Sequence, residues 1–120
     1  GVREFWKSAA RALAVGAGVV GCASLEGARL YRDGSAALDR GQSAEAIELL
    51  ERAALRVPRA SEIQNHLGIA YAAAGRHDAA LAAWQRAVAL DCDNAAAGRN
   101  LDAALQRMLE LGAESARIRE

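Results

Sequence analysis

Cysteine, proline and aromatic residues are scarce in this chain of 120 residues, and the chain carries no net charge. Its two cysteines lie seventy residues apart, which cannot make a disulfide framework or a zinc site. Aromatic residues make up 4% of the chain, whereas 31 residues are alanine, so helices are favoured over sheets. Fifteen basic residues balance fifteen acidic ones, and a neutral chain lacks the electrostatic footprint of a general nucleic-acid binder. The composition therefore favours an all-α fold and argues against nucleic acid as a partner.

The beginning of the chain differs from the remainder. Arg3, Lys7 and Arg11 precede or open an uncharged apolar run that extends over residues 12–23. This run has the length of a signal-peptide core and is short for a bilayer span. Beyond it the sequence is charged, alanine-rich and periodic. We therefore divide the chain into a signal-like or membrane-anchor segment, residues 1–24, and a helical domain, residues 25–120.

The helical domain contains an internal repeat. A shift of the sequence by 34 residues aligns it with itself, and the matches include glycines and bulky apolar residues as well as alanines. The aligned pairs are Gly34 and Gly68, Gly41 and Gly75, Ala46 and Ala80, and Leu50 and Trp84.

Each repeat is predicted to be a helical hairpin, because apolar residues recur at helical spacing on both sides of a glycine. Gly41 and Gly75 can take the left-handed conformation that ends a helix. Ser61 and Gln64 fit a capping box, in which the serine accepts from the backbone and the glutamine reaches back. The predicted helices cover residues 25–40, 43–56, 61–74, 77–90 and 95–111.

Two glycines are expected inside helices rather than at their ends. Gly34 and Gly68 each cost about 1 kcal/mol relative to alanine at such a position. That cost is explained if another helix packs against the bare backbone. We therefore expect Leu50 and Trp84 to be buried at equivalent places in the two repeats.

Residues 65–71 (Asn-His-Leu-Gly-Ile-Ala-Tyr), followed at the same spacing by Gly75, Ala80, Trp84 and Ala87, resemble a tetratricopeptide repeat (TPR). The resemblance implies an all-α fold of helical hairpins and a lone amphipathic helix that covers the last apolar face. The apolar run at residues 12–23 adds an N-terminal apolar helical segment to the expected fold. The corresponding segments are a repeat at 27–60, a repeat at 61–94 and a capping helix at 95–111.

The resemblance also implies where a partner binds. In TPR modules the first helix of each hairpin lines a concave face that holds a protein segment, either a peptide or a helix. Tyr31 is the leading candidate because aromatic anchors are enriched at binding hot spots, and Asn65 follows as an exposed amide. The full set of expected groove residues is Tyr31, Ser35, Leu38, Asn65, Ile69, Ala72 and Arg99, with Ala103 and Gln106 further along the last helix.

Two interpretations of the N-terminal segment stay open. Residues 19–22 (Val-Val-Gly-Cys) resemble a bacterial lipobox, in which the Cys22 thiol would take a diacylglycerol and a peptidase would cleave after the small residue before it. Alternatively, the segment is an uncleaved membrane helix, with Phe5 and Trp6 at the interface and small residues packed against partner helices. A third possibility is a helix that folds into a soluble assembly.

No catalytic constellation is recognisable. Residues 16–21 (Gly-Ala-Gly-Val-Val-Gly) form a literal G-x-G-x-x-G motif, which would suggest a fragment of a dinucleotide-binding oxidoreductase. The preceding apolar run is short for a strand, and no second strand with a ribose-binding acid follows. The candidates for metal ligands, His66, His77 and Cys92, have no usable spacing. We expect no enzyme activity, no metal, no cofactor and no small-molecule substrate.

The sequence thus predicts a membrane-tethered TPR protein–protein interaction module. It would serve as an accessory or assembly subunit of a bacterial envelope complex, with the TPR domain in the periplasm or attached through an uncleaved helix. The alternatives are a soluble, self-assembling TPR scaffold and the oxidoreductase fragment.

Overall fold

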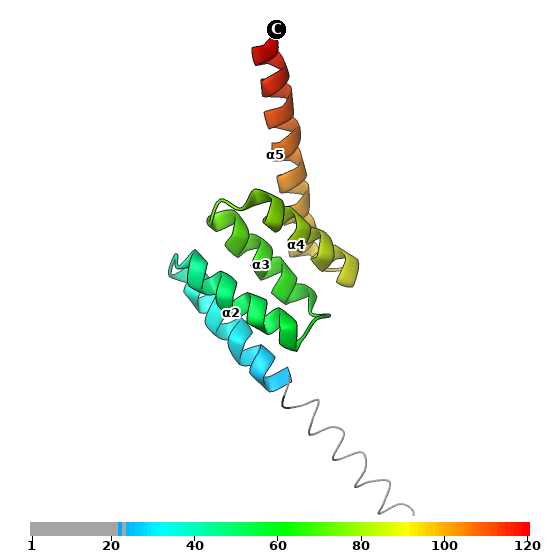
Figure 1. Cartoon of the computed structure of the whole chain (residues 1–120). Coiled ribbons are helices and arrows are strands. Elements are labelled where there is room, and N and C mark those ends of the chain that lie inside the picture. Colours follow the sequence, from blue (N-terminus) through cyan, green and yellow to red (C-terminus); the bar gives the residue numbers. More distant parts are fainter. Residues whose placement is uncertain (1–21, 23) are drawn as a thin grey trace, which may run out of the picture.

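A computed structural model describes residue 22 and residues 24–120 of the chain. The described residues form helices and no strand, so the all-α prediction is confirmed for this part (Figure 1). The expected apolar helix of the N-terminal segment lies outside the described residues. The helices are a first helix over residues 24–39, α2 (Ser43–Arg56), α3 (Ser61–Ala73), α4 (His77–Leu90) and α5 (Ala95–Arg119).

The helices form two hairpins and a final single helix. The first helix pairs with α2, and α3 pairs with α4, while α2 packs on α3 and α4 packs on α5 (Figure 1). The inner helices of the stack have apolar residues on two sides. Each of them therefore packs against two neighbouring helices. The arrangement is that predicted from the 34-residue repeat.

The two hairpin turns have the same structure. Gly41 and Gly75 adopt positive φ angles of 76° and 78°, as expected for residues that end a helix in the left-handed conformation. After Gly41, the amide of Gln42 donates to the carbonyl of Ala37 at 2.9 Å. The equivalent bond of the second repeat runs from Arg76 to Tyr71 at 2.8 Å.

The mid-helix glycines allow the close packing that the sequence predicts. A Cβ atom on Gly34 would lie 2.8 Å from Cγ of Leu50, and one on Gly68 would lie 2.6 Å from Cδ1 of Trp84. Leu50 is fully buried and Trp84 is 8% exposed, so the prediction that both side chains are buried at equivalent places is confirmed. Gly27 is a third such place, since its Cβ would meet the side chain of Val57.

The predicted capping box at the start of α3 is wrong. Ala60 is the residue that precedes the helix, and it makes no side-chain capping bond. The Ser61 hydroxyl instead donates to the carbonyl of Ala87 at 2.7 Å, and it accepts from the Asn94 side-chain amide at 2.8 Å. Gln64 does not reach back either, because its side-chain oxygen accepts from Arg86. The tertiary partners compete successfully with the local cap.

The capping helix is longer than the predicted 95–111. It begins after Asn94, whose side chain accepts from the amide of Ala97 at 3.1 Å, and it continues to Arg119. The prediction ended the helix next to Gly112, but a single glycine costs only about 1 kcal/mol in a helix and does not stop it. Residues 105–119 are exposed throughout and project from the body (Figure 1).

Replacing Gly68 with alanine tests the close contact with Trp84. We expect Gly68→Ala to lower the free energy of unfolding by about 1–3 kcal/mol, because the new methyl group overlaps the indole ring. Gly98→Ala is the matched control, since a Cβ on Gly98 meets open space in α5. It should raise stability by up to about 1 kcal/mol through helix propensity. Urea unfolding of both variants measures the difference, and a Gly68→Ala protein as stable as the parent would contradict this account.

Candidate partner-binding surface

The first helix, α3 and α5 carry the residues expected to line the groove, and we call their shared surface the inner face. Tyr31 on the first helix meets His66 on α3. Its hydroxyl lies 3.3 Å from Nδ1 of His66, and the two rings are edge to face with centroids 5.0 Å apart. The same Nδ1 lies 3.0 Å from the carbonyl of Glu62, so the imidazole either accepts from the phenol or donates to the backbone.

Tyr31 is therefore half-buried rather than free, and it packs against the core. Burial raises the pKa of its phenol above the ordinary value of 10.0, and the nearby Glu62 carboxylate raises it further. Part of the Tyr31 side chain stays exposed. A further part of its role is to join two repeats.

Asn65 is not the exposed amide that the sequence analysis expected. Its side chain is 3% exposed, and its Oδ1 atom accepts from the side-chain amide of Asn100 on α5 at 2.9 Å. Its backbone carbonyl also accepts from Nε1 of Trp84 at 3.2 Å. A side chain with these partners positions α5 and Trp84, and it has little surface left for a ligand.

The two polar pairs occupy equivalent places in the repeat. Tyr31 and Asn65 are 34 residues apart, and so are their partners His66 and Asn100. The same joint between successive repeats is thus an aromatic pair at the first junction and an amide pair at the second. The spacing of apolar residues in the sequence does not reveal this joint, because polar groups form it. Alignment of the repeats with knowledge of the helix packing would have revealed it.

The remaining groove residues lie in different environments. Leu38, Ile69 and Ala72 are half-buried and pack against the core. Ser35 is also half-buried, and its enclosed hydroxyl oxygen has no hydrogen-bond partner among the residues that the structure describes. Arg99, Ala103 and Gln106 are exposed on α5. Tyr31 and Asn65 thus make polar contacts between helices, while the other expected groove residues provide most of the accessible surface of the inner face.

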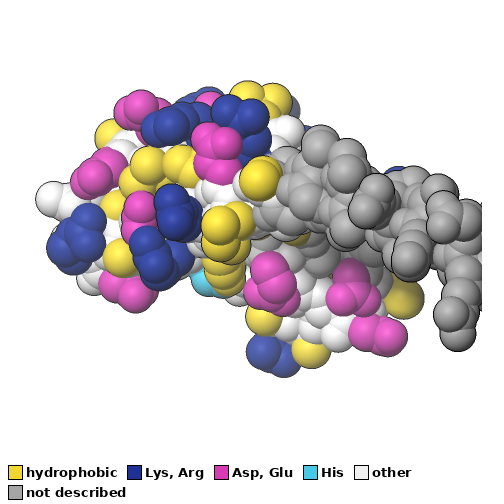
Figure 2. All heavy atoms as spheres, turned by 90° about the horizontal axis from the view of Figure 1, so that it is seen from below, with side chains coloured by type: hydrophobic (Ala, Val, Ile, Leu, Met, Phe, Trp, Pro, Cys, Tyr) yellow, Lys and Arg dark blue, Asp and Glu magenta, His cyan; other side chains and the backbone are white. Residues whose placement is uncertain are grey.

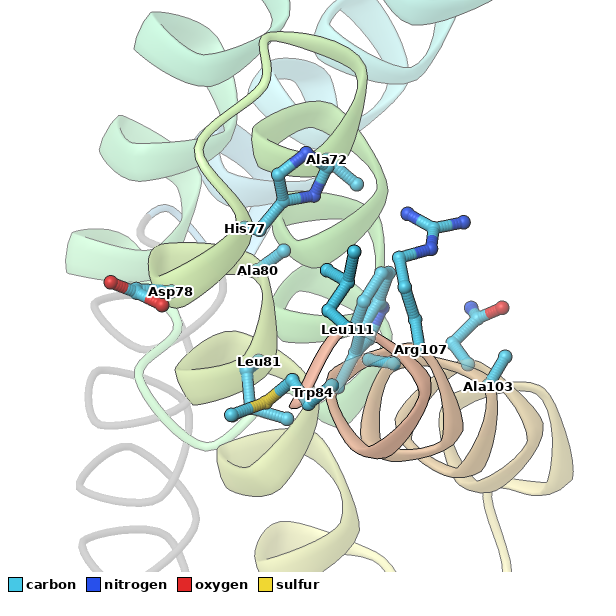
Figure 3. A pocket seen from close by; sticks show the side chains of 12 residues that line it. Ala72, His77, Asp78, Ala80, Leu81, Trp84, Ala103, Arg107 and Leu111 are labelled. Atoms are coloured by element: carbon cyan, nitrogen blue, oxygen red, sulfur yellow. The ribbon is translucent and has the colours of Figure 1, made fainter. Parts of the chain in front are cut away.

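A cavity of about 380 Å³ opens where α5 separates from α4 (Figure 3). Its apolar wall includes Leu81 and Trp84 from α4 and Met108 and Leu111 from α5, and Ala72 closes one side. Polar groups lie around it, with Asp78 and Arg107 on opposite sides (Figure 3). Of the predicted groove residues only Ala72 and Ala103 line it. The cavity was not predicted from the sequence, because the last helix was expected to cover the last apolar face of the repeats.

Charges on the surface are mixed. On the face of the described residues in Figure 2, basic and acidic side chains are interspersed and apolar side chains lie between them. The described residues contain no group of three His, Cys, Asp or Glu side chains that could hold a metal ion. The glycine motif at 16–21 lies outside the described residues. The inner face and the cavity are the two surfaces of the described residues that we consider as candidates for contact with a protein partner.

Stacked helical hairpins whose first helices form one inner face are the architecture of a helical-repeat interaction scaffold. The tetratricopeptide repeat family matches residues 31–99. This match covers more than half of the chain, so the chain belongs to that family. No curated protein matches the chain. TPR repeats bind protein partners, and we conclude that this chain is a protein–protein interaction module.

The buried amide pair gives a stability prediction. Asn65→Ala should lower the free energy of unfolding by about 1–3 kcal/mol, because it leaves the Asn100 amide without its partner. Asn100→Ala should cost a similar amount, and the double variant should cost less than the sum of the two. Arg99→Ala, next to Asn100 but exposed, should change stability by less than about 0.5 kcal/mol. Chemical unfolding of the four variants is the measurement, and additivity of the two asparagine variants would rule out the pair.

The two tyrosines give a pH prediction. Burial raises the pKa of Tyr71 above 10.0 as well, and its hydrogen bond to Glu51, 2.7 Å long, acts in the same direction. A raised folded-state pKa adds stability below the unfolded value near pH 10, and this stability is lost as the pH rises through the folded pKa. We expect the free energy of unfolding to fall above about pH 10. Phenolate absorbance resolves the two groups, because the chain has two tyrosines and the Tyr31→Phe and Tyr71→Phe variants keep one each. Phenols that titrate at or below their unfolded value would contradict the burial.

Proposed function

We propose that this TPR module is held at a bacterial membrane by its N-terminal segment and acts there as an accessory or assembly subunit of an envelope complex. The observation that carries the interaction role is the stack of two TPR hairpins with its inner face. The observation that carries the tether is the sequence of residues 1–24. A module of this size would bring one protein segment to a fixed place at the membrane surface.

The tether rests on the order of charged and apolar residues. Arg3, Lys7 and Arg11 lie before or at the start of the run 12–23, and basic residues in this position favour the inner side of a membrane. Among the described residues, no helix has the length and apolar character needed to cross a bilayer. The proposed anchor is in the segment that precedes them.

Two mechanisms of attachment follow from the same residues. In the first, a signal peptidase cleaves before Cys22 and the thiol carries a diacylglycerol. Cys22 is exposed, as its modification requires. In the second, the segment is retained as a helix and packs on helices of a partner through small residues such as Ala14 and Gly18.

The inner face favours a particular class of partner. Capture of a peptide's terminal carboxylate needs several basic and amide side chains, and of the two candidates Asn65 is already bonded to Asn100. Arg99 alone is exposed. We therefore infer that the partner is an extended or helical segment held by apolar and mixed contacts, to Ile69, Ala72 and the exposed part of Tyr31.

Fractionation of cells that express the natural gene tests the tether. The full chain should sediment with membranes, and a chain without residues 1–24 should be soluble and keep its helical circular dichroism. Mass spectrometry of the native N-terminus separates the mechanisms, since a lipidated Cys22 means a lipoprotein and an intact segment means a retained helix. Recovery of the full chain in the soluble fraction, with no detergent and no partner, would overturn both.

Retention of copurified protein from native membranes tests the interaction role. Arg99→Glu changes an exposed residue of α5. Arg52→Glu makes the same change at an exposed position of α2, away from the inner face. We expect the Arg99 variant to lose its partner and the Arg52 variant to keep it, with equal melting temperatures. Equal retention by both variants would place binding outside the inner face.

A further inference from the structure

The projecting half of α5, residues 105–119, carries the exposed part of a stripe of side chains, which no other helix of the described residues covers. Six residues, five of them apolar and one a serine, follow each other at alternating spacings of three and four, which is the a/d pattern of a coiled coil. The first two pack against the core formed with α4, and the last four are exposed. The stripe therefore continues an existing helix–helix interface beyond the N-terminal end of α4 (Figure 1). Its members are Leu101, Ala104, Met108, Leu111, Ser115 and Ile118.

The serine does not exclude the stripe from an interface. A serine hydroxyl inside a helix can donate to the backbone carbonyl four residues earlier, which for Ser115 is that of Leu111. Its polar group then needs no partner on a neighbouring helix. Because the side chain is also small, this position allows a second helix to come close.

The projecting half is not expected to persist alone in water. With 15 residues it is about as long as the isolated helices that are marginal there, and it contains Gly112, which lowers helix propensity. It also exposes large apolar side chains, with Met108 at 52%, Leu111 at 57% and Ile118 at 80%. A second helix packed along the stripe would bury these side chains and stabilise the projecting part of α5.

The cavity described above lies at the base of the same stripe. Met108 and Leu111 belong to both, and Leu81 and Trp84 complete the cavity's apolar wall (Figure 3). An occupant that follows the stripe down to α4 thus reaches a ready recess for one large apolar side chain. Ile118, at the far tip of the stripe, is a side chain of that kind.

We propose that the occupant is a second copy of this chain, with the two α5 helices antiparallel and Ile118 of each copy in the cavity of the other. This pairing fixes the register of the two helices, because Met108 and Ile118 are ten residues apart, about 15 Å along the helix. Antiparallel pairing about residue 113 places Ile118 of one copy beside Met108 of the other. The same register places Ser115 opposite Leu111, and the small residues Gly112 and Ser115 near the two-fold axis allow the helices to approach closely.

Sterics favour this orientation. In a parallel pair, the α4 helices of both copies would pack on the same end of the two paired α5 helices. The hairpins of the two copies would then overlap. In the antiparallel pair they lie at opposite ends. Arg117 and Arg119 flank Ile118, and the cavity that receives it has Asp78 on one side and Arg107 on the other (Figure 3). The tip and the recess are both on one chain, so a closed two-fold dimer uses each contact twice.

Sedimentation of the full chain in a mild detergent, over a range of concentrations, tests the dimer. We expect a reversible monomer–dimer equilibrium. Ile118→Asp should raise its dissociation constant about tenfold or more, because the carboxylate cannot be buried in the cavity. Leu55→Asp is the matched control, since Leu55 on α2 is 81% exposed and Ile118 is 80% exposed. Circular dichroism verifies that both variants stay folded. A chain that remains monomeric at every concentration, or an Ile118→Asp variant that dimerises as tightly as the parent, would overturn the proposal.

Disulfide cross-linking tests the orientation. In a chain whose natural cysteines are replaced (Cys22→Ser and Cys92→Ser), Leu111→Cys and Ser115→Cys are made separately. Antiparallel pairing predicts that a mixture of the two oxidises mainly to the mixed dimer. Parallel pairing predicts that each variant cross-links mainly to itself, and that result would overturn the antiparallel arrangement.

Discussion

The contact of a large side chain with the bare backbone of a mid-helix glycine sets the geometry of both hairpins. Leu50 lies on Gly34 and Trp84 lies on Gly68, at equivalent places in the two repeats. Each glycine loses helix propensity, and the loss is offset by apolar area buried where two helix axes come close. The approach also brings the indole nitrogen of Trp84 to the carbonyl of Asn65, which fixes α4 against α3. The inner face exists because these two contacts hold the hairpins at the same spacing.

The joint between repeats is a second constraint, and it is polar. Tyr31 with His66 and Asn65 with Asn100 bind successive first helices of the hairpins to each other at one register. The amide pair is buried more deeply than the aromatic pair, so the second junction is more specific in its geometry. The first junction keeps part of an aromatic ring at the surface. A partner segment on the inner face would therefore meet different chemistry at the two junctions.

Much of the fold could be predicted from the sequence. The glycines of the turns, the 34-residue repeat and the apolar period determine α2, α3 and α4 to within a residue. The environment of Ser61 and Asn65 could not be predicted, because both side chains bond to residues 26 to 35 positions away. Local rules assign such side chains to caps or to the surface. The extent of α5 was underestimated because the predicted apolar stripe ends at Leu111 and no breaker marks the end of the helix at Arg119. The cavity depends on where two helices diverge, which no periodicity encodes.

The buried cluster around Asn94 has a mechanical meaning. Asn94 begins α5, bonds Ser61 at the start of α3, and through that hydroxyl is connected to the last turn of α4. Five residues into α5, Asn100 makes a second bond to α3. A pull on the projecting end of α5 would therefore strain two side-chain bonds to α3 together with the apolar contact to α4. Tension applied at this end would be shared by the whole second hairpin before the helix could peel away from its neighbour.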